Sequence, residues 1–435
     1  MISSPLDRLQ QPPILEPAEL QLQAPERLTL TGGVPLNILR AGDSEVIRID
    51  LVVRGGRWHQ TQPLQALFTN RMLREGTRRY SAARLSEQLD YYGALLELSS
   101  SNEYSFLTLY TLSRYFSETL DLLVSMVAEP IFSPERLDLV VANNLQRHRV
   151  NLERVDFQAQ RSLLRHLYGA GHPLGQVVEE AHYRALTSDA LRSFYEEYYR
   201  PSCFTLYASG AVTDDCVRRL DDAFGAAASS VFAASDASVP VTPPYHPCPS
   251  ADRRLFVPRK GAMQSAVCLG HLTIGCTHPD YHRLRVLISL FGGYFGSRLM
   301  QNIREEKGYT YGISAGLLTY PGHGRLVISA EADNRYVEPL ITEVYHEIER
   351  LQTELVPEDE LQMVRHYLIG ELCRSYESAF SLSDAWIFQQ TMGVGMQFNA
   401  DAFEAIKTVT SEQLRELARR YLIPSEMKEA VCGDL

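Results

Sequence analysis

The sequence predicts an α+β fold of two tandem, homologous α/β sandwich domains, each a mixed or antiparallel sheet covered by helices. Three observations support this prediction. The chain has 435 residues, which is enough for two domains of ordinary size. A set of helix-boundary signals occurs twice at one spacing along the chain. Each copy also contains strand-like alternating runs next to amphipathic helical runs.

The repeated signals mark the starts and ends of helices. Thr187–Leu191 reads TSDAL and Thr410–Leu414 reads TSEQL, a spacing of 223 residues (410 − 187 = 223). Threonine or serine caps the free amides of a helix start, and an acidic residue in the first turn favours the helix dipole. Two pairs of prolines repeat the spacing: Pro134 and Pro357, and Pro201 and Pro424. Pro134 and Pro357 suit a first helical position, whereas the later prolines follow a helix that has ended.

The remaining elements are predicted from the spacing of apolar residues. Val46–Val53 and Gly324–Ala330 alternate as strands do. Glu118–Ala128 and Val337–Leu351 have the spacing of amphipathic helices. A short apolar strand is expected after each repeated helix, CFTLYASGAV in the first half and EAVCGDL in the second.

The repeat divides the chain into three parts. Residues 1–225 are predicted to form the first domain and residues 255–435 the second. Between them, residues 226–254 are rich in alanine, serine and proline, a composition typical of an extended linker.

The net charge and the cysteines indicate which partners the protein binds and in which cellular compartment it is found. The net charge is −11, which disfavours nucleic acid, because proteins that bind it present a basic face. The seven cysteines include no Cys-x-x-Cys pair, as expected of reduced thiols in a cytosol-like compartment. Neither a signal peptide nor an apolar run long enough to span a membrane is apparent. We therefore expect a cytoplasmic protein that binds neither nucleic acid nor membrane.

Four segments carry a resemblance through their order and spacing: Met72–Thr77 (MLREGT), Gly171–Gly175 (GHPLG), Tyr198–Ser202 (YYRPS) and Phe291–Tyr311 (FGGYFGSRLMQNIREEKGYTY). Together they resemble the pitrilysin/insulinase family, peptidase family M16, and specifically its half-length members with two domains. The resemblance covers most of the chain, from residue 45 onward. It implies that the two domains form one half of a clamshell chamber that encloses peptides.

Active members of this family carry a His-x-x-Glu-His zinc motif on the helix just before the Met-Leu-x-x-Gly-Thr segment. The resemblance aligns the three motif positions with Leu67, Asn70 and Arg71. Their spacing puts them on one helical face, but leucine has no lone pair, asparagine cannot take a proton from water, and arginine brings positive charge. We expect no zinc here and no catalytic residue in this chain.

The family's third zinc ligand, a glutamate, is expected in the helix that begins at Pro134. The corresponding region, Leu145–Asn151, contains no carboxylate. We therefore expect no cofactor in this chain and zinc only in a partner subunit. His172, within the GHPLG segment, is interpreted as a structural turn residue.

The resemblance also identifies Arg304 and Tyr311 as substrate-binding residues. Family members have an arginine and a tyrosine seven residues apart in the second half, as here (311 − 304 = 7), which donate hydrogen bonds to the substrate backbone and to the scissile carbonyl. Guanidinium and phenol groups are suitable donors to such an oxyanion. The alternative is that Arg304 belongs to an exposed helix end and Tyr311 to the core of a strand.

Gly292 and Gly293 correspond to a glycine-rich loop that contacts peptide substrates in the family. Glycine removes the side chain where another backbone approaches. The alternative for both glycines is a tight connection between helices. Tyr294 and Phe295 interrupt the longer glycine run that some non-catalytic members carry.

Two hypotheses of function follow from the resemblance. In the first, this chain is the non-catalytic, substrate-binding subunit of a heterodimeric zinc metallopeptidase that degrades or processes peptides, active only with a zinc-bearing M16-like subunit. In the second, it is a structural or peptide-binding M16-like protein without a role in hydrolysis. A peptide or unfolded protein is the expected ligand in both, and self-association into a homodimer stays open.

Overall fold

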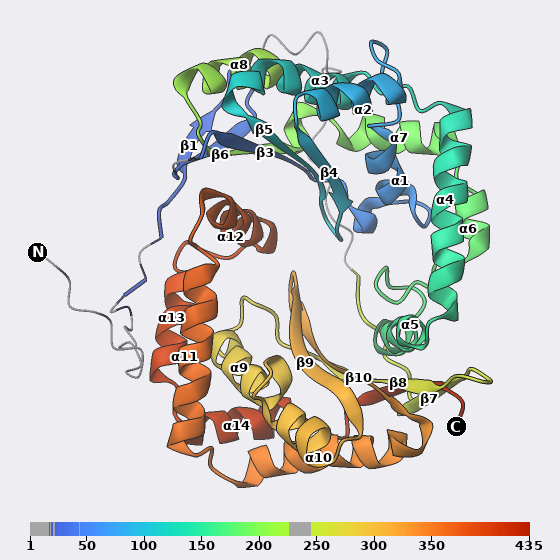
Figure 1. Ribbon diagram of the computed structural model, residues 1–435, viewed down its shortest axis with the longest axis vertical. Coiled ribbons are helices and arrows are strands. Elements are labelled where there is room, and N and C mark those ends of the chain that lie inside the picture. The colour runs from blue at the N-terminus through green and yellow to red at the C-terminus, as the bar shows by residue number, and fades with distance from the viewer. Residues whose placement is uncertain (1–16, 18, 21, 43, 226–244) are drawn as a thin grey trace, which may run out of the picture.

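A computed structural model describes residues 17, 19–20, 22–42, 44–225 and 245–435 (Figure 1). Two β-sheets face one another, each with its own layer of helices on the outer side. Most of the predicted linker, residues 226–244, lies outside the described residues. Residues 245–253 contain no helix or strand.

The first sheet has six strands in the order β1-β2-β6-β3-β5-β4. Its strands are β1 (Glu26–Thr29), β2 (Pro35–Arg40), β3 (Val46–Val53), β4 (Leu95–Ser100), β5 (Ser105–Leu112) and β6 (Phe204–Gly210). Strands β2 and β6 pair in parallel and the other neighbours pair antiparallel, so the sheet is mixed as predicted. The predicted strands at Val46–Val53 and after Pro201 are confirmed.

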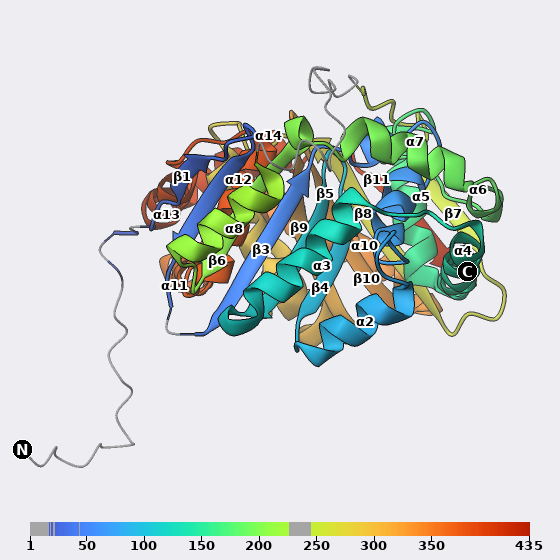
Figure 2. The ribbon, with the colours of Figure 1, turned by 90° about the horizontal axis from the view of Figure 1, so that it is seen from above.

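Helices cover the outer face of this sheet (Figure 2). The helices of the first half are α1 (Gln65–Met72), α2 (Ala82–Tyr91), α3 (Phe116–Ala128), α4 (Pro134–Glu153), α5 (Val155–Tyr168), α6 (Glu180–Arg184), α7 (Ser188–Tyr198) and α8 (Asp214–Phe224). Ile47, Ile49 and Leu51 of β3 are fully buried in a core with residues of α3, α7 and α8. Burying alternate residues of the strand in this way holds the helical layer on the sheet.

The second sheet repeats this topology with five strands in the order β7-β11-β8-β10-β9. The strands are β7 (Arg254–Pro258), β8 (Gln264–Thr273), β9 (Thr310–Tyr320), β10 (His323–Asp333) and β11 (Lys428–Gly433). Strands β7 and β11 pair in parallel, as β2 and β6 do in the first sheet. The helices are α9 (Tyr281–Ile288), α10 (Val337–Thr353), α11 (Glu358–Arg374), α12 (Ala379–Met392), α13 (Phe398–Thr408) and α14 (Ser411–Tyr421), with two π-helical segments, η5 (Ser289–Gly293) and η6 (Met300–Glu306).

The helix-boundary signals that revealed the duplication act as predicted, with one shift. Thr187 and Thr410 are the N-caps of α7 and α14, and each side chain accepts a hydrogen bond from the amide three residues later. Pro134 is the first residue of α4. Pro357 is instead the N-cap of α11, one residue before the helix begins, so the prediction of a first helical position is wrong there.

The two halves exchange one helix each. Helices α5 and α12 occupy equivalent places in the repeat, because their first residues are 224 apart (379 − 155 = 224). Leu163 and Leu167 of α5 pack on the inner face of the second sheet, in one cluster with β8 and β11. Trp386 and Ile387 of α12 pack on the inner face of the first sheet (Figure 1). Each sheet is therefore completed by the opposite half of the sequence.

A buried ion pair reinforces the contact of α12 with the first sheet. On β3, Arg48 donates to the Oδ1 of Asp50 at 2.9 Å and reaches across to the Oδ1 of Asp384 on α12 at 2.6 Å. Burial opposes the charge of Arg48, but its hydrogen bonds to Asp384 and Asp50 outweigh that effect and raise its pKa. The Thr108 hydroxyl donates to Asp50 at 2.7 Å. The contact of Arg48 with Asp384 joins residues that are 336 positions apart in the sequence.

None of the helices in the described part of the chain combines the length and apolar character needed to cross a membrane. The 20-residue α4, for example, carries charged side chains at both of its ends and on its buried side a histidine.

Candidate functional site

The three zinc-motif positions lie on α1, the helix just before the Met72–Thr77 segment. Leu67 and Arg71 are half-buried and line one cavity of about 370 Å³ between α1, α4 and α5. Asn70 is fully buried. Leu67 and Arg71 therefore face the cavity, whereas Asn70 is directed at the neighbouring strands, and the three side chains are an aliphatic, a cation and an amide.

Asn70 joins α1 to the neighbouring strands. Its Nδ2 donates to the carbonyl oxygens of Ser99 on β4, at 2.5 Å, and Phe106 on β5, at 3.2 Å. A glutamate in this orientation would place carboxylate oxygens against two carbonyl oxygens. The amide therefore has a structural role that a water-activating carboxylate does not share.

The residues at these three positions do not fit a zinc ion. Arg71 donates through Nη1 to the Oδ1 of Asn144 on α4, and its Cζ lies 5.8 Å from the ring centroid of Phe68. A fixed guanidinium repels a dication, and zinc takes nitrogen, sulfur or carboxylate ligands. Among the residues that the structure describes, no three His, Cys, Asp or Glu side chains are grouped so that they could hold a metal ion.

The region of the expected third ligand faces the same cavity. Asn144, Arg147, His148 and Asn151 of α4 all line it, and none is a carboxylate. His148 is only 6% exposed, and its ring packs against that of Tyr183 with the centroids 5.2 Å apart. Burial lowers the pKa of His148, as does the charge of a neighbouring arginine.

Arg304 and Tyr311 lie together at the other candidate site. Arg304 is in η6 and Tyr311 is near the start of β9. The Cζ of Arg304 lies 5.5 Å from the ring centroid of Tyr311 and 4.6 Å from that of Phe295. Tyr311 is 90% exposed, so the alternative that it belongs to the core of a strand is wrong.

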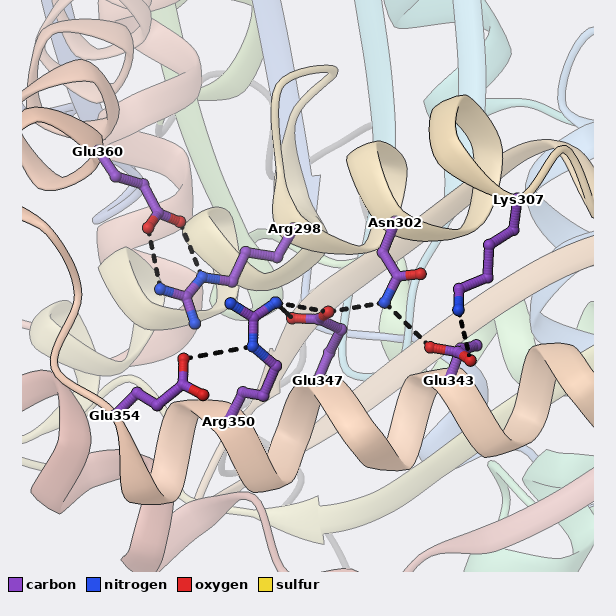
Figure 3. A network of polar contacts seen from close by, with 8 residues as sticks. All are labelled: Arg298, Asn302, Lys307, Glu343, Glu347, Arg350, Glu354 and Glu360. Atoms are coloured by element: carbon purple, nitrogen blue, oxygen red, sulfur yellow. Dashed lines mark hydrogen bonds and ion pairs between the residues drawn. The ribbon is translucent and has the colours of Figure 1, made fainter.

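A polar network fixes the segment that carries Arg304 (Figure 3). Before η6, Arg298 makes a bidentate ion pair with Glu360 on α11, at 2.8 and 2.9 Å. Within η6, the Asn302 Nδ2 donates to Glu347 on α10 at 2.7 Å and to Glu343 at 3.1 Å. Because these contacts precede Arg304 by a few residues, they set the position of its backbone.

The same network continues on the other side of Arg304. Lys307 donates to Glu343 at 2.8 Å, so η6 is held to α10 at its end as well (Figure 3). Glu347 is 1% exposed and also accepts a hydrogen bond from Arg350 at 3.0 Å. Bidentate and charge-assisted bonds of this kind hold geometry well. Arg304 therefore projects from a segment that is anchored on both sides.

The two predicted glycines differ in their surroundings. Gly292 is buried in η5, and a Cβ added there would lie 2.7 Å from the Cβ of Ala315 on β9. Close packing of η5 on β9 therefore explains this glycine without a ligand. Gly293 is exposed, and its nearest neighbour would be the Ser289 side chain at 3.3 Å. A contact with substrate stays a prediction for both.

Tyr311 lines a groove of about 650 Å³ on the inner face of the second sheet. Strands β8, β9 and β10 form its floor, and Asp156 and Gln160 of α5 form one wall. Burial raises the pKa of Cys268 in this groove to about 12, which keeps its thiol neutral. Because α5 belongs to the first half of the sequence, both halves build the groove.

Sequence reasoning missed three residues of this site. Phe295, treated there only as an interruption of a glycine run, provides the second ring against Arg304. Asp156 and Gln160 reach the groove because α5 crosses to the second sheet. Neither α5 nor α12 was identified from the sequence as one of two equivalent helices, and no signal in the sequence indicates a crossing.

His172 has the structural role that the sequence predicts. Its Nδ1 accepts a hydrogen bond from the amide of Leu174 at 3.1 Å, within the turn. The ring packs against Tyr168, with centroids 4.7 Å apart, and against Trp58, at 6.3 Å. Burial, with the nearby charges of His323 and Arg57, lowers the pKa of His172 to about 4.

Comparison with known proteins agrees with this fold. Residues 41–179 match the family described as insulinase (peptidase family M16), and residues 185–368 match the one described as peptidase M16 inactive domain. The uncharacterized zinc protease YmxG of Bacillus subtilis is 23% identical over 360 residues, which cover 82% of this chain and 85% of that protein. The non-peptidase homolog YmxG of Helicobacter pylori is 20% identical over 385 residues, covering 85% and 84% respectively.

Among solved structures, the peptidase M16 inactive domain from Pseudomonas fluorescens is similar to this chain with a TM-score of 0.84. The sequences are 19% identical, and the match covers 96% of this chain and 99% of that one. At this level of sequence identity, the comparison shows that the two chains share a fold. The chain belongs to the peptidase M16 family.

Proposed function

We propose that this chain is the non-catalytic, substrate-binding subunit of a heterodimeric zinc metallopeptidase that degrades or processes peptides. The observation that carries the proposal is the pairing of Arg304 with an exposed Tyr311 on an anchored segment, in a chain whose zinc helix has no metal ligand. In this proposal the exposed phenol and the guanidinium beside it serve to contact the substrate.

In this proposal the partner is a zinc-bearing M16-like subunit, which supplies both the metal and the water-activating glutamate. This chain contributes binding and positioning. The Tyr311 hydroxyl donates to the oxygen of the scissile carbonyl as negative charge develops there, and Arg304 donates to the substrate backbone. Its stacking on Phe295 and Tyr311 limits the orientations of the guanidinium before substrate arrives.

The groove beside Tyr311 suits an extended peptide. Strand β9 is the last strand of its sheet, so one of its edges has no neighbouring strand in the described part of the chain. An extended peptide can pair with such an edge through its backbone while its side chains contact the groove. Peptides or unfolded segments, rather than folded proteins, are therefore the proposed substrates.

Co-expression with a His-x-x-Glu-His homologue tests the proposal, with cleavage of a quenched fluorescent peptide as the measurement. We expect cleavage to require both chains and to fall about a hundredfold in kcat with Tyr311→Phe, the usual effect of losing one oxyanion donor. Tyr309→Phe is the matched control, because the ring of Tyr309 stacks on Tyr336 with centroids 4.9 Å apart.

Two results would contradict the proposal. One is a partner that cleaves equally well without this chain. The other is a complex of both chains whose kcat is unchanged by Tyr311→Phe and by Arg304→Ala. That second result would support the alternative, a structural or peptide-binding protein without a role in hydrolysis.

A further inference from the structure

Three arginines line the cavity that stands where the family holds zinc. The cavity of about 370 Å³ lies between α1, α4 and α5, and Arg71, Arg147 and Arg161 contribute to its walls. None of the described residues that line it is an aspartate or a glutamate. The site is thus cationic at the place where active family members are built to hold a cation.

None of these arginines forms a direct ion pair with a carboxylate of the described residues, although the charge of Glu179 acts on Arg161. Arg71 donates to the Asn144 Oδ1, and Arg161 donates to the carbonyl oxygen of Val178 at 3.3 Å, so both acceptors are neutral. Arg147 makes no hydrogen bond or ion pair in the part of the chain that the structure describes. Burial lowers the pKa of Arg71, and the charge of Arg147 adds to that effect. A bound anion would relieve both.

The carboxylates nearby are already engaged. Glu180 binds Arg149 at 2.6 Å and also pairs with Arg184 on its own helix. The Glu179 side chain accepts a hydrogen bond as the N-cap of α6. Neither residue lines the cavity. The charge of the three arginines therefore remains available to a ligand.

His148 gives an independent indication of a ligand. It lines the same cavity, is 6% exposed, and its Nε2 is buried without a hydrogen-bond partner in the described residues. An unsatisfied buried nitrogen costs about 1–3 kcal/mol. As the N–H tautomer or as imidazolium, this ring can donate to an anion held by the arginines.

The rest of the cavity is apolar and limits the kind of anion. Its apolar lining includes Leu67, Leu164 and Leu174. We propose that the cavity binds the C-terminal carboxylate of a peptide whose last side chain is apolar. Guanidinium groups pair with a carboxylate through two parallel hydrogen bonds, and the apolar side chain covers the leucines. An inorganic phosphate would leave the apolar wall in contact with water.

This proposal concerns the chain by itself and does not rest on the proposed peptidase partner. It is tested on the purified chain alone, by fluorescence anisotropy with a fluorescein-labelled Gly-Ser-Gly-Ala-Leu peptide. The free acid is compared with the C-terminal amide, which removes the anion and keeps the leucine. We expect the acid to bind about tenfold more tightly or better, as for loss of one charge-assisted pair.

Arg147→Ala is the informative variant, because Arg147 is exposed and its loss breaks no hydrogen bond or ion pair of the described residues. We expect it to weaken binding of the acid about tenfold, with no change for the amide. Arg165→Ala is the matched control, since Arg165 is an exposed arginine of α5 that does not line the cavity. It should change the affinity less than about twofold.

Three results would overturn the proposal. The first is equal affinity of the acid and the amide. The second is equal weakening of binding by Arg147→Ala and Arg165→Ala. The third is displacement of the peptide by inorganic phosphate at concentrations equal to those of unlabelled acid peptide. The last result would indicate an anion site without a role for the apolar wall. None of these results depends on proteolysis, so they are independent of the test of the proposed function.

Discussion

The guanidinium of Arg304 lies over the ring of Tyr311, with its Cζ 5.5 Å from the ring centroid. The two are seven positions apart in the sequence, and a turn at Gly308, with a φ of +64°, brings them together. The cation–π contact orients a phenol that is otherwise exposed to water. Because Tyr311 is exposed, substitutions of this residue can test its role in function without a large change in the stability of the protein.

Tyr311→Ala is expected to change the free energy of unfolding by less than about 0.5 kcal/mol, because the side chain is 90% exposed. Tyr309→Ala should destabilise the protein more, since the ring of Tyr309 stacks on that of Tyr336. Urea denaturation followed by circular dichroism measures both. A loss above about 1 kcal/mol for Tyr311→Ala would indicate a structural role for this tyrosine instead.

Glu347→Ala is expected to destabilise the protein by about 2 kcal/mol, because it removes a buried acceptor from both Asn302 and Arg350. Glu354→Ala, on the same helix, is the control and should cost no more than about 0.5 kcal/mol, since that carboxylate is half-exposed. Thermal unfolding of the two variants side by side provides the measurement. Equal melting temperatures would show that the network does not anchor η6.

Gly292→Ala should destabilise the protein by about 1–3 kcal/mol, because the new methyl group would lie 2.7 Å from the Cβ of Ala315. Gly293→Ala faces only the Ser289 side chain at 3.3 Å and is expected to have a much smaller effect. Chemical denaturation compares the neighbouring variants. If Gly292→Ala is as stable as wild type, packing does not explain this glycine and a role in ligand contact gains support.

Arg48→Met is expected to destabilise the contact of α12 with the first sheet by about 3–5 kcal/mol, because it leaves the fully buried Asp50 without its cation. Asp384→Asn keeps a hydrogen-bond acceptor, and its side chain is 63% exposed, so its effect should stay within about 1 kcal/mol. Limited proteolysis within Ala379–Met392 reports the opening of this contact. Equal cleavage rates in the two variants would contradict the expectation.

His172 is expected to make stability depend on pH. Burial lowers its pKa from the ordinary value of 6.5 to about 4, so below pH 6.5 the unfolded chain takes up a proton more readily than the folded one. Its contribution is therefore complete above pH 6.5 and is lost as the pH falls toward 4.

His172→Asn tests this, because asparagine keeps an acceptor for the amide of Leu174 and does not titrate. Free energies of unfolding measured between pH 7 and pH 4 should fall less steeply in the variant than in the wild type. Parallel curves would show that His172 is not the source of the dependence.

Much of the fold could be predicted because its signals are local. The caps at Thr187 and Thr410 and the alternation in Val46–Val53 depend on neighbouring residues, and the structure has the helices and strand there. The misplaced boundary at Pro357 differs by a single residue, because proline suits both the N-cap and the first helical position. The predicted linker also ends one residue late, since Arg254 is already the first residue of β7.

The candidate site could be predicted only in part. Leu67, Asn70 and Arg71 were identified because a motif with fixed spacing on one helix can be recognised in the sequence. The second ring against Arg304, from Phe295, was not, since contact between side chains nine residues apart depends on how η6 and the preceding loop fold. The cationic character of the cavity was also not predicted, because Arg147 and Arg161 come from different helices than Arg71.

The sequence by itself determined the duplication and the two sheets with their helices, because each depends on residue types at short or repeated spacings. Only the tertiary structure decided that α5 and α12 change places between the halves, so that Asp156 joins Tyr311 at one groove and Arg161 joins Arg71 at one cavity. The physical reason is that both helices have an apolar face that either sheet could bury. The choice between the sheets depends on contacts such as that of Arg48 with Asp384, more than 300 residues apart.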